Sequence, residues 1–265
     1  MYWLRTAVAK QRFSKNWTVK KIKYGASSKQ YYLTADSTSQ PEDSAKPWAI
    51  YLHGGAWTFG SPEQFLPAAR PFIEAGYRVV LPSYQRLTHQ DFDGIWHDLK
   101  TCLSHYQNKY GGSGPAVLAG ISGGGHLTAS LASHPTVWKD LEWENPATVI
   151  LCGSVLDLDQ MPDSFGIRKL AGKRGSDQFN RANPAWWMQR NDDPPGRFLL
   201  VHGDADKIVA IDQSLSYVEV LKKKNLQAEL LIVENGTHLD SGRWMYRDGE
   251  VMQKIKEVLK PNSDR

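Results

Sequence analysis

The hydrophobic positions of the chain gather into short continuous runs, separated by longer segments in which polar and apolar residues mix. Six of these runs have the length and composition of strands that are buried on both faces of a parallel sheet. They are residues 48–52, 77–81, 116–121, 149–152, 198–201 and 230–233. Segments of helical length follow them at 62–74, 91–110, 124–134, 212–224 and 249–259. This alternation predicts an α/β fold with a mostly parallel, doubly wound sheet and helices on both faces.

Two earlier segments have the alternating polar and apolar pattern of half-buried strands. Residues 18–24 and 29–34 flank a turn at 25–28, and they favour an antiparallel edge of the sheet. With them the expected sheet has about eight strands. We expect a single domain over residues 1–265, in which the stretch at about 156–196 is an insertion. Insertions of this length in compact domains tend to be lids or binding loops.

The composition is that of an ordinary globular protein, with 41% hydrophobic and 23% charged residues and a formal net charge of +4. Basic residues occur in short runs, which favours solvated faces and not a nucleic-acid partner. Cys102 and Cys152 lack metal-ligand spacing, so no metal site is predicted. No run approaches the roughly 20 apolar residues of a membrane span. The first residues lack the apolar core of a signal peptide, so we expect a cytoplasmic protein without a membrane partner. The oligomeric state stays open, a homodimer included.

The stretch Gly120-Ile121-Ser122-Gly123-Gly124 stands where an apolar run passes into a helix of small residues. It matches G-x-S-x-G, the turn that holds a nucleophilic serine in a strained backbone conformation at the end of an α/β sheet. Glycines two residues on either side of Ser122 remove side chains that would collide with the strand and the helix. A plain structural turn and a phosphate-binding loop are the alternatives, although the Lys-Ser/Thr ending of phosphate loops is missing. Ser122 is therefore the candidate nucleophile.

The stretch His53-Gly54-Gly55-Ala56-Trp57 follows the run at 48–52, at the end of the sheet where open α/β folds bind ligands. Paired glycines let backbone N–H groups approach a substrate oxygen closely. Gly54 and Gly55, together with Gly123, are therefore candidates for an oxyanion hole. A tight turn that needs positive φ is the alternative explanation.

A serine nucleophile needs an imidazole base, and the base needs a carboxylate on its other ring nitrogen. The chain order for this type of turn is Ser, then Asp or Glu, then His. Of the eight histidines, only His238 follows both Asp204 and Asp206. We favour Asp206 as the carboxylate, because Asp204 sits where an aspartate usually bonds its own turn. His126 and His202 are interpreted as structural or pocket-lining residues.

Together these motifs resemble the α/β-hydrolase superfamily, and in particular the branch of carboxylesterases and arylformamidases that carries an H-G-G-x-W oxyanion loop. The resemblance rests on residues 53–57, on 120–124 followed by His126-Leu127, on 153–158, on His202-Gly203-x-x-Asp206, and on His238. It implies the α/β-hydrolase fold, a Ser122, Asp206 and His238 triad, and hydrolysis of esters or amides without a cofactor. The short region before the oxyanion loop suggests a small or absent lid.

The activity expected from this resemblance is hydrolysis of small carboxylic esters through an acyl-enzyme on Ser122. Hydrolysis of N-formylkynurenine by an arylformamidase is one alternative, and a non-catalytic binding protein with the same fold is another. In each case the partner is a small molecule. Trp57, His126, Trp186 and Trp187 are candidates for the lining of the substrate pocket, because aromatic side chains often line apolar pockets.

Overall fold

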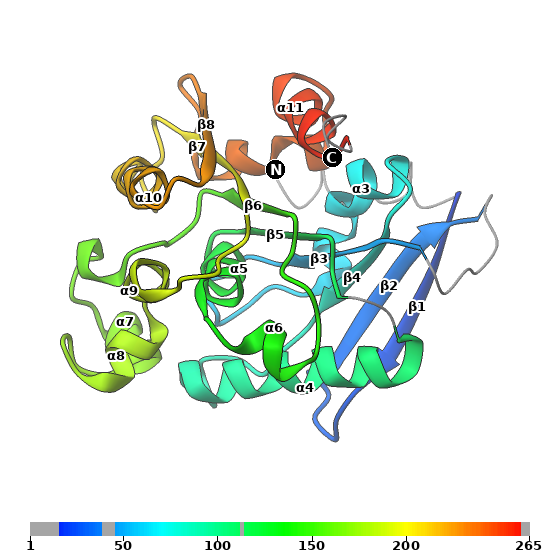
Figure 1. The fold of residues 1–265 in the computed structure, drawn as a ribbon, viewed down its shortest axis with the longest axis horizontal. Coiled ribbons are helices and arrows are strands. Elements are labelled where there is room, and N and C mark those ends of the chain that lie inside the picture. Colours follow the sequence, from blue (N-terminus) through cyan, green and yellow to red (C-terminus); the bar gives the residue numbers. More distant parts are fainter. Residues whose placement is uncertain (1–15, 39–45, 112–113, 261–265) are drawn as a thin grey trace.

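The computed structural model describes residues 16–38, 46–111 and 114–260, so the N-terminal residues considered above for a signal peptide lie outside the described part. Eight strands form one sheet in the order β1-β2-β4-β3-β5-β6-β7-β8 (Figure 1). The strands are β1 (Trp17–Lys23), β2 (Tyr31–Ser37), β3 (Trp48–Leu52), β4 (Arg78–Pro82), β5 (Val117–Ile121), β6 (Thr148–Cys152), β7 (Arg197–Gly203) and β8 (Gln227–Val233). β2 pairs antiparallel with β1 and β4, and all other neighbours are parallel. The predicted sheet is confirmed.

Helices cover both faces of the sheet (Figure 1). On one face lie α4 (Phe92–Tyr110), α5 (Gly123–Ser133) and α10 (Asp212–Lys223), and on the other lie α3 (Arg70–Glu74) and α11 (Glu250–Val258). The shorter elements are α2 (Pro62–Phe65), η2 (Leu66–Ala69), α6 (Val137–Asp140), η3 (Leu158–Gln160), α7 (Phe165–Ala171), α8 (Asp177–Ala182), α9 (Pro184–Arg190) and η4 (His238–Met245). In the described part of the chain, no helix has both the length and the apolarity that crossing a membrane requires.

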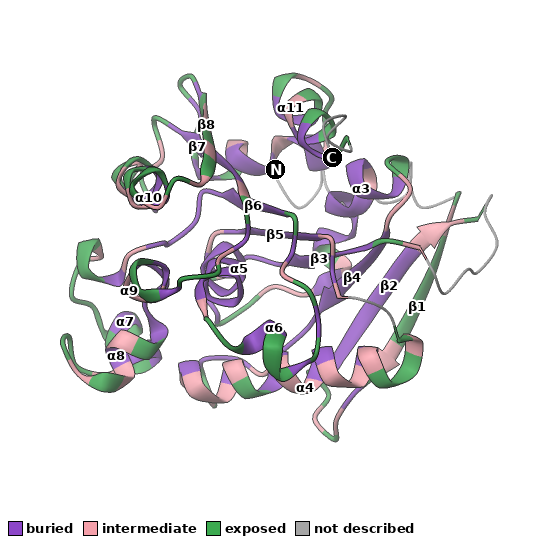
Figure 2. Ribbon diagram, in the orientation of Figure 1, coloured by how far each residue is buried: buried purple, intermediate pink, exposed green. Residues whose placement is uncertain are grey.

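The central strands are apolar at most positions because both of their faces are covered. In β3, Ile50 and Leu52 belong to the hydrophobic cluster on the α4 and α5 side, whereas Ala49 and Tyr51 belong to the cluster on the α3 and α11 side. Successive side chains of a strand point to opposite faces, so a strand in the middle of such a sheet has no solvent-facing position. Figure 2 shows that α5 is buried along its whole length, like the strands beside it.

The segment at 62–74, predicted as one helix, consists of three short pieces, α2, η2 and α3. Pro67 and Pro71 explain the breaks, because proline has no N–H to donate to the preceding turn. Strand β8 begins at Gln227, earlier than the predicted Leu230. The prediction missed its first residues because they alternate between exposed and half-buried at the edge of the sheet and form no apolar run. The apolar run at 230–233 therefore marks only the second half of this strand.

Glu63 of α2 ties this helix to the antiparallel edge of the sheet. Its Oε1 accepts a hydrogen bond from Lys21 Nζ at 2.9 Å, and its Oε2 accepts one from Tyr31 Oη at 2.7 Å. Burial alone would raise the pKa of Glu63, but the two donors lower it to about 2. The carboxylate therefore stays ionised and bonds both β1 and β2.

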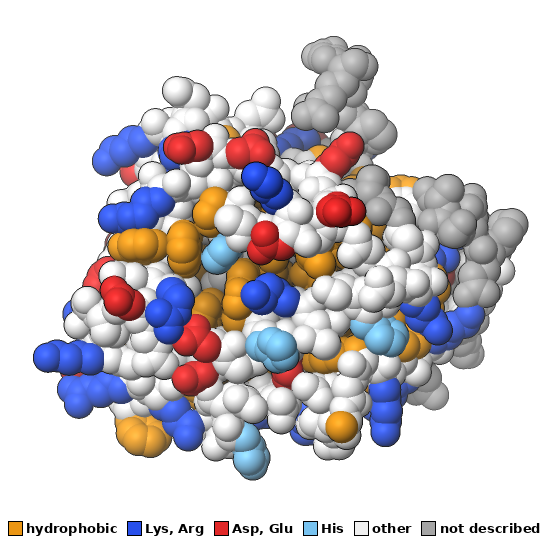
Figure 3. Space-filling model, turned by 60° about the horizontal axis from the view of Figure 1, so that its bottom comes forward, with side chains coloured by type: hydrophobic (Ala, Val, Ile, Leu, Met, Phe, Trp, Pro, Cys, Tyr) orange, Lys and Arg blue, Asp and Glu red, His pale blue; other side chains and the backbone are white. Residues whose placement is uncertain are grey.

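The segment at about 156–196, predicted as an insertion, holds η3, α7, α8 and α9 between β6 and β7, and these helices pack on the side of α4 and α5 (Figure 1). Arg181 of α8 donates to Asp93 of α4 at 2.7 Å. Arg174, part of a basic stretch in the sequence, pairs with Asp159 at 3.2 Å. On the face that Figure 3 shows, lysine and arginine side chains lie among aspartates and glutamates instead of forming a patch of one sign.

Candidate active site

Ser122 stands at the junction of β5 and α5 with φ +56° and ψ −127°. For a residue other than glycine, such a conformation costs on the order of 1–3 kcal/mol. The turn is held on both sides, since the Ser122 N–H donates to the carbonyl of Cys152 and the Ser122 carbonyl accepts from the N–H of His126, each at 2.9 Å. A Cβ at Gly124 would lie 2.6 Å from the carbonyl carbon of His53, which explains the need for glycine there. The serine is left half-exposed at the carboxyl end of its strand.

The loop after β3 has three consecutive residues with positive φ: Gly55 at 128°, Ala56 at 47° and Trp57 at 58°. Six non-glycine residues have positive φ in the described part of the chain, and Ala56, Trp57 and Ser122 are three of them. Strain of this kind persists only where the surrounding structure fixes the backbone. The Gly55 carbonyl provides part of that constraint, because it accepts the N–H groups of two residues in the following turn at 2.9 Å each.

Residues 83–87, which follow β4, hold the same loop from its other side. The ring of Tyr84 stacks on that of His53 with centroids 4.8 Å apart and an interplanar angle of 5°. Arg86 donates through Nη2 to the carbonyl of Gly60 at 2.6 Å. Burial lowers the pKa of His53 to about 3, so the imidazole is neutral. The loop is therefore fixed before any ligand arrives.

The glycines of this loop lie against the candidate nucleophile. A Cβ at Gly54 would be 3.4 Å from the Cβ of Ser122, and a Cβ at Gly123 would be 3.2 Å from the backbone nitrogen of Trp57. Within the described ranges, the N–H groups of Gly55 and Gly123 donate to no protein acceptor. Unpaired amides beside a nucleophile are what a developing oxyanion requires.

The loops after β7 and β8 lie side by side because their strands are neighbours. The N–H of Ala205 donates to the carbonyl of Gly236 at 3.0 Å, and a Cβ at Gly203 would meet the Gly236 carbonyl carbon at 2.5 Å. This close approach brings the two predicted residues together. His238 Nδ1 lies 2.7 Å from Asp206 Oδ2.

The carboxylate of Asp206 is fully buried and has hydrogen-bond partners on both oxygens. Oδ1 accepts the N–H groups of Ile208 at 2.8 Å and Val209 at 3.0 Å. Oδ2 accepts from His238 and lies 3.3 Å from His202 Nε2. Burial alone would raise the pKa of Asp206, but the hydrogen bonds from His202 and His238 hold it below its usual range. The carboxylate is therefore ionised and fixed in orientation.

His202 has a structural role that sequence reasoning did not specify. Its Nε2 lies 2.9 Å from the carbonyl of Val209 as well as close to Asp206, and its Nδ1 lies 2.7 Å from Ser214 Oγ. Because both partners of Nε2 are acceptors, we assign the proton to Nε2. His202 thus orients the carboxylate. The competing Asp204 is exposed.

Ser122 and His238 line the same cavity of about 270 Å³. The other residues of its lining are small or apolar: Gly54, Gly55, Ala56, Phe59, Phe65, Ile121, Ile208 and Leu239. Sequence reasoning missed its large side chains, Phe59, Phe65, Ile208 and Leu239. The sequence did indicate two of them by their position, because Leu239 directly follows His238 and Ile208 comes two residues after the candidate aspartate.

The four residues predicted to line the pocket do not belong to this cavity. Trp57 is buried, with its Nε1 donating to His126 Nδ1 at 3.2 Å, and His126 Nε2 lies 2.7 Å from the carbonyl of Ala182. Burial lowers the pKa of His126 to about 4, so this ring is neutral. Trp186 and Trp187 belong to α9, where their rings pack edge to face at 4.8 Å. Trp57 and His126 therefore connect the loop after β3, α5 and α8, and Trp187 packs against His134 at the end of α5 with ring centroids 4.5 Å apart.

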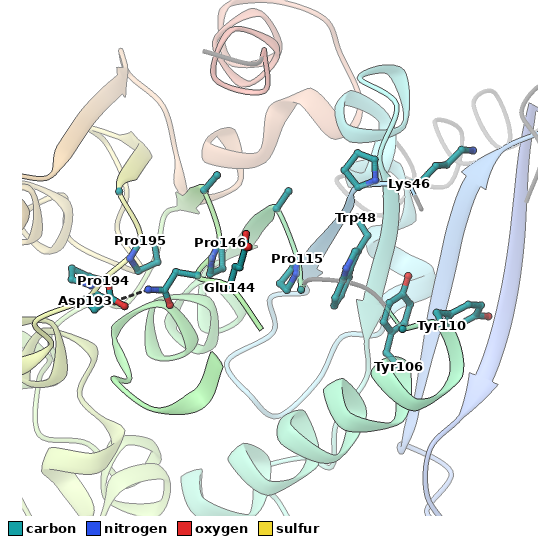
Figure 4. A pocket seen from close by; sticks show the side chains of 17 residues that line it. Lys46, Trp48, Tyr106, Tyr110, Pro115, Glu144, Pro146, Asp193, Pro194 and Pro195 are labelled. Carbon is teal, nitrogen blue, oxygen red and sulfur yellow. Dashed lines mark hydrogen bonds between the residues drawn. The ribbon is translucent and has the colours of Figure 1, made fainter. Parts of the chain in front are cut away.

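A larger cavity of about 580 Å³ lies at the opposite, amino ends of the parallel strands (Figure 4). Its lining includes Trp48, Ala116, Ala147 and Gly196, which start or directly precede β3, β5, β6 and β7. It contains none of the predicted site residues. Ligands of open α/β sheets bind at the carboxyl ends of the strands. The smaller cavity at Ser122 is therefore the candidate active site.

Three features define an α/β hydrolase. They are a mostly parallel eight-stranded sheet, a strained serine between β5 and α5, and an aspartate after β7 that contacts a histidine after β8. The structure thus has the architecture that the motifs predicted. The profile of the BD-FAE family matches residues 37–221, well over half of the chain. The chain belongs to the BD-FAE family, and with it to the esterase-like hydrolases.

Sequence comparison finds relatives at low identity. Kynurenine formamidase of Drosophila melanogaster is 23% identical over 216 residues, which cover 76% of this chain and 69% of that protein. Esterase LipC of Mycobacterium tuberculosis is 26% identical over 202 residues, which cover 66% of this chain and 48% of LipC.

Among solved structures, a truncated carbohydrate esterase from gut microbiota has a TM-score of 0.76 at 18% identity, covering 91% of this chain and 95% of its own. Esterase B from Lactobacillus rhamnosis has a TM-score of 0.74 at 21% identity, and the match covers 97% of this chain and 90% of the esterase B chain. At these identities the likeness establishes the fold.

Proposed function

We propose that the protein is a serine hydrolase that cleaves small, uncharged carboxylic esters through an acyl-enzyme on Ser122. The observation that carries this proposal is the 2.7 Å contact between His238 Nδ1 and Asp206 Oδ2, in a site where His238 and Ser122 line one cavity. Because Nδ1 donates to an ionised carboxylate, Nε2 is left as the basic nitrogen of the imidazole. Esterases among the relatives and structural neighbours give independent support.

In the first half of the reaction, Ser122 Oγ attacks the ester carbonyl carbon and its proton passes to His238 Nε2. The negative charge that develops on the carbonyl oxygen is stabilised by the free N–H groups of Gly55 and Gly123, with Gly54 beside them. The tetrahedral intermediate collapses as the bond to the alcohol oxygen breaks. His238 gives its proton to the departing oxygen, and the acyl group stays on Ser122.

In the second half, a water molecule takes the place of the alcohol. His238 removes one proton from the water while its oxygen attacks the acyl carbon, and the same amides stabilise the second oxyanion. The bond to Ser122 Oγ then breaks, and His238 returns the proton to the serine. The carboxylic acid leaves, and the enzyme regains its starting state.

Hydrolysis of p-nitrophenyl butyrate by the Ser122→Ala variant tests this proposal. We expect turnover to fall to the background rate while the far-UV circular dichroism spectrum and the melting temperature stay close to those of the wild type. Ser104→Ala is the matched control, because Ser104 is a half-buried serine in α4, outside the cavity. Turnover by Ser122→Ala at the wild-type rate would contradict the proposal.

Formamidase activity is the second candidate, favoured by the similarity to the kynurenine formamidase of Drosophila melanogaster. N-formylkynurenine carries an ammonium and a carboxylate, and charges taken out of water need ionic partners. The described lining of the cavity contains no Asp, Glu, Lys or Arg side chain. The neutral ester is therefore the preferred substrate. Comparing kcat/KM for N-formylkynurenine with that for p-nitrophenyl butyrate separates the two activities.

A further inference from the structure

Three apolar side chains surround the entrance to the cavity at Ser122 and are exposed to solvent. Phe59 is 59% exposed, Ile208 is 69% exposed and Leu239 is 39% exposed. Seven large hydrophobic residues are exposed in the described part of the chain, and these three are the ones that line this cavity. Single exposed hydrophobic residues need no explanation, but a cluster at a cavity marks a binding surface.

Each of the three side chains comes from a different segment of the site. The backbone at each position is held in the same segment as Gly55, Asp206 or His238. Phe59 lies in the turn that follows residues 53–57, where its N–H donates to the Gly55 carbonyl at 2.9 Å. The N–H of Ile208 donates to the carboxylate of Asp206 at 2.8 Å. Leu239 follows the catalytic histidine in η4. Because their backbone is already fixed, binding an apolar group against them costs little ordering of the loops.

The wall deeper in the cavity is also apolar. Phe65 of α2 is 5% exposed and stacks against the ring of His53 with centroids 6.0 Å apart. Ile121, directly before the nucleophile, completes this wall. At about 270 Å³ the cavity lies just below the usual range of small-molecule sites, about 300–1,000 Å³. A chain longer than a short acyl group must therefore extend outward over the entrance.

From this arrangement we propose that Phe59, Ile208 and Leu239 form an apolar collar that determines specificity. The collar binds the part of an uncharged aliphatic acyl chain that extends beyond the cavity, so the enzyme prefers medium-chain esters to acetates and rejects acyl chains with a terminal charge. The inference rests on the proposed function and adds its substrate class. A carboxylate on the chain would lose its hydration against the apolar wall without gaining an ionic partner.

A series of p-nitrophenyl acetate, butyrate, hexanoate and octanoate tests the collar. Each ester is used at a concentration below the one at which it forms micelles. We expect kcat/KM to rise along the series by up to about fourfold for each CH₂ that contacts the protein. p-Nitrophenyl hemisuccinate has as many acyl carbons as the butyrate but ends in a carboxylate. We expect its kcat/KM to be lower than that of the butyrate by at least about tenfold.

The double variant Ile208→Ser with Leu239→Ser should lower the hexanoate to acetate ratio of kcat/KM by at least about fourfold. Phe165→Ser is the matched control, because Phe165 is 83% exposed on α7 and does not line the cavity. Its ratio should equal that of the wild type. Equal kcat/KM along the series, a double variant with the wild-type ratio, or equal rates for hemisuccinate and butyrate would overturn the inference. A wild-type enzyme that cleaves none of the esters would instead overturn the proposed function.

Discussion

Gly55→Ala should reduce catalysis more than it reduces stability. Gly55 has φ +128°, and a Cβ on it would lie 2.7 Å from the carbonyl carbon of Phe59. The loop must shift to admit the methyl group, and this shift moves the Gly55 N–H away from the oxyanion. Loss of one such donor typically lowers kcat by about 10²–10³-fold, or about 2.7–4 kcal/mol of transition-state stabilisation. The backbone strain itself should lower the free energy of unfolding by about 1–3 kcal/mol.

Gly76→Ala separates the two effects. Gly76 has φ +90° in the turn before β4, and an added Cβ would have no atom within 4 Å. This variant should lose stability through backbone strain and keep the wild-type kcat. The assay is kcat for p-nitrophenyl butyrate, together with the urea midpoint of unfolding for both variants. A Gly55→Ala enzyme that folds and has a kcat within about threefold of wild type would refute the assignment of this amide to the oxyanion hole.

Three further variants test the network around the site. Asp206→Asn should lower kcat by about 10³–10⁴-fold, because an amide no longer fixes the required tautomer of His238; a loss below tenfold would argue against this pairing. Trp57→Phe leaves the buried Nδ1 of His126 without its donor and should lower the free energy of unfolding, measured in urea, by about 1–3 kcal/mol. An unchanged urea midpoint would exclude a stabilising role for this hydrogen bond. The pKa of Glu63 is lowered, so its carboxylate stabilises the fold above about pH 4.5 and this contribution disappears as the pH falls toward 2. The wild type should therefore exceed Glu63→Gln in stability by at most about 1 kcal/mol at pH 7 and lose the advantage at low pH, whereas an advantage that grows on acidification would contradict the assigned ion pair.

The buried strands could be predicted from the sequence because their environment leaves no freedom in residue type. β3 occupies residues 48–52 as predicted, since both of its faces meet apolar layers. Elements with one exposed face were predicted less well. The start of β8 carries polar residues such as Glu229, and the helices of the insertion are too short for a clear period. Their N-terminal signals were nevertheless present, for example Ser176, whose side chain caps α8.

The proximity of Ser122, Asp206 and His238 could also be predicted, because the ends of neighbouring parallel strands meet at one edge of the sheet. The side chains that shape the cavity could not. Phe59 and Ile208 lie on loops, and hydrophobic periodicity does not describe the path of a loop. Trp186 and Trp187 were assigned to the pocket on residue type alone, but Trp187 packs against His134 at the end of α5, and Trp186 contacts Trp187 and Arg190 of its own helix.

Covalent labelling of the protein with a fluorophosphonate probe tests the central claim most directly, because such probes react with an activated serine and with no resting hydroxyl. Peptide mapping by mass spectrometry then identifies the modified residue. We predict one label per chain on Ser122, and a greatly reduced labelling rate for His238→Ala. Labelling of a different serine, or labelling of Ser122 that proceeds as fast without His238, would contradict the proposed triad.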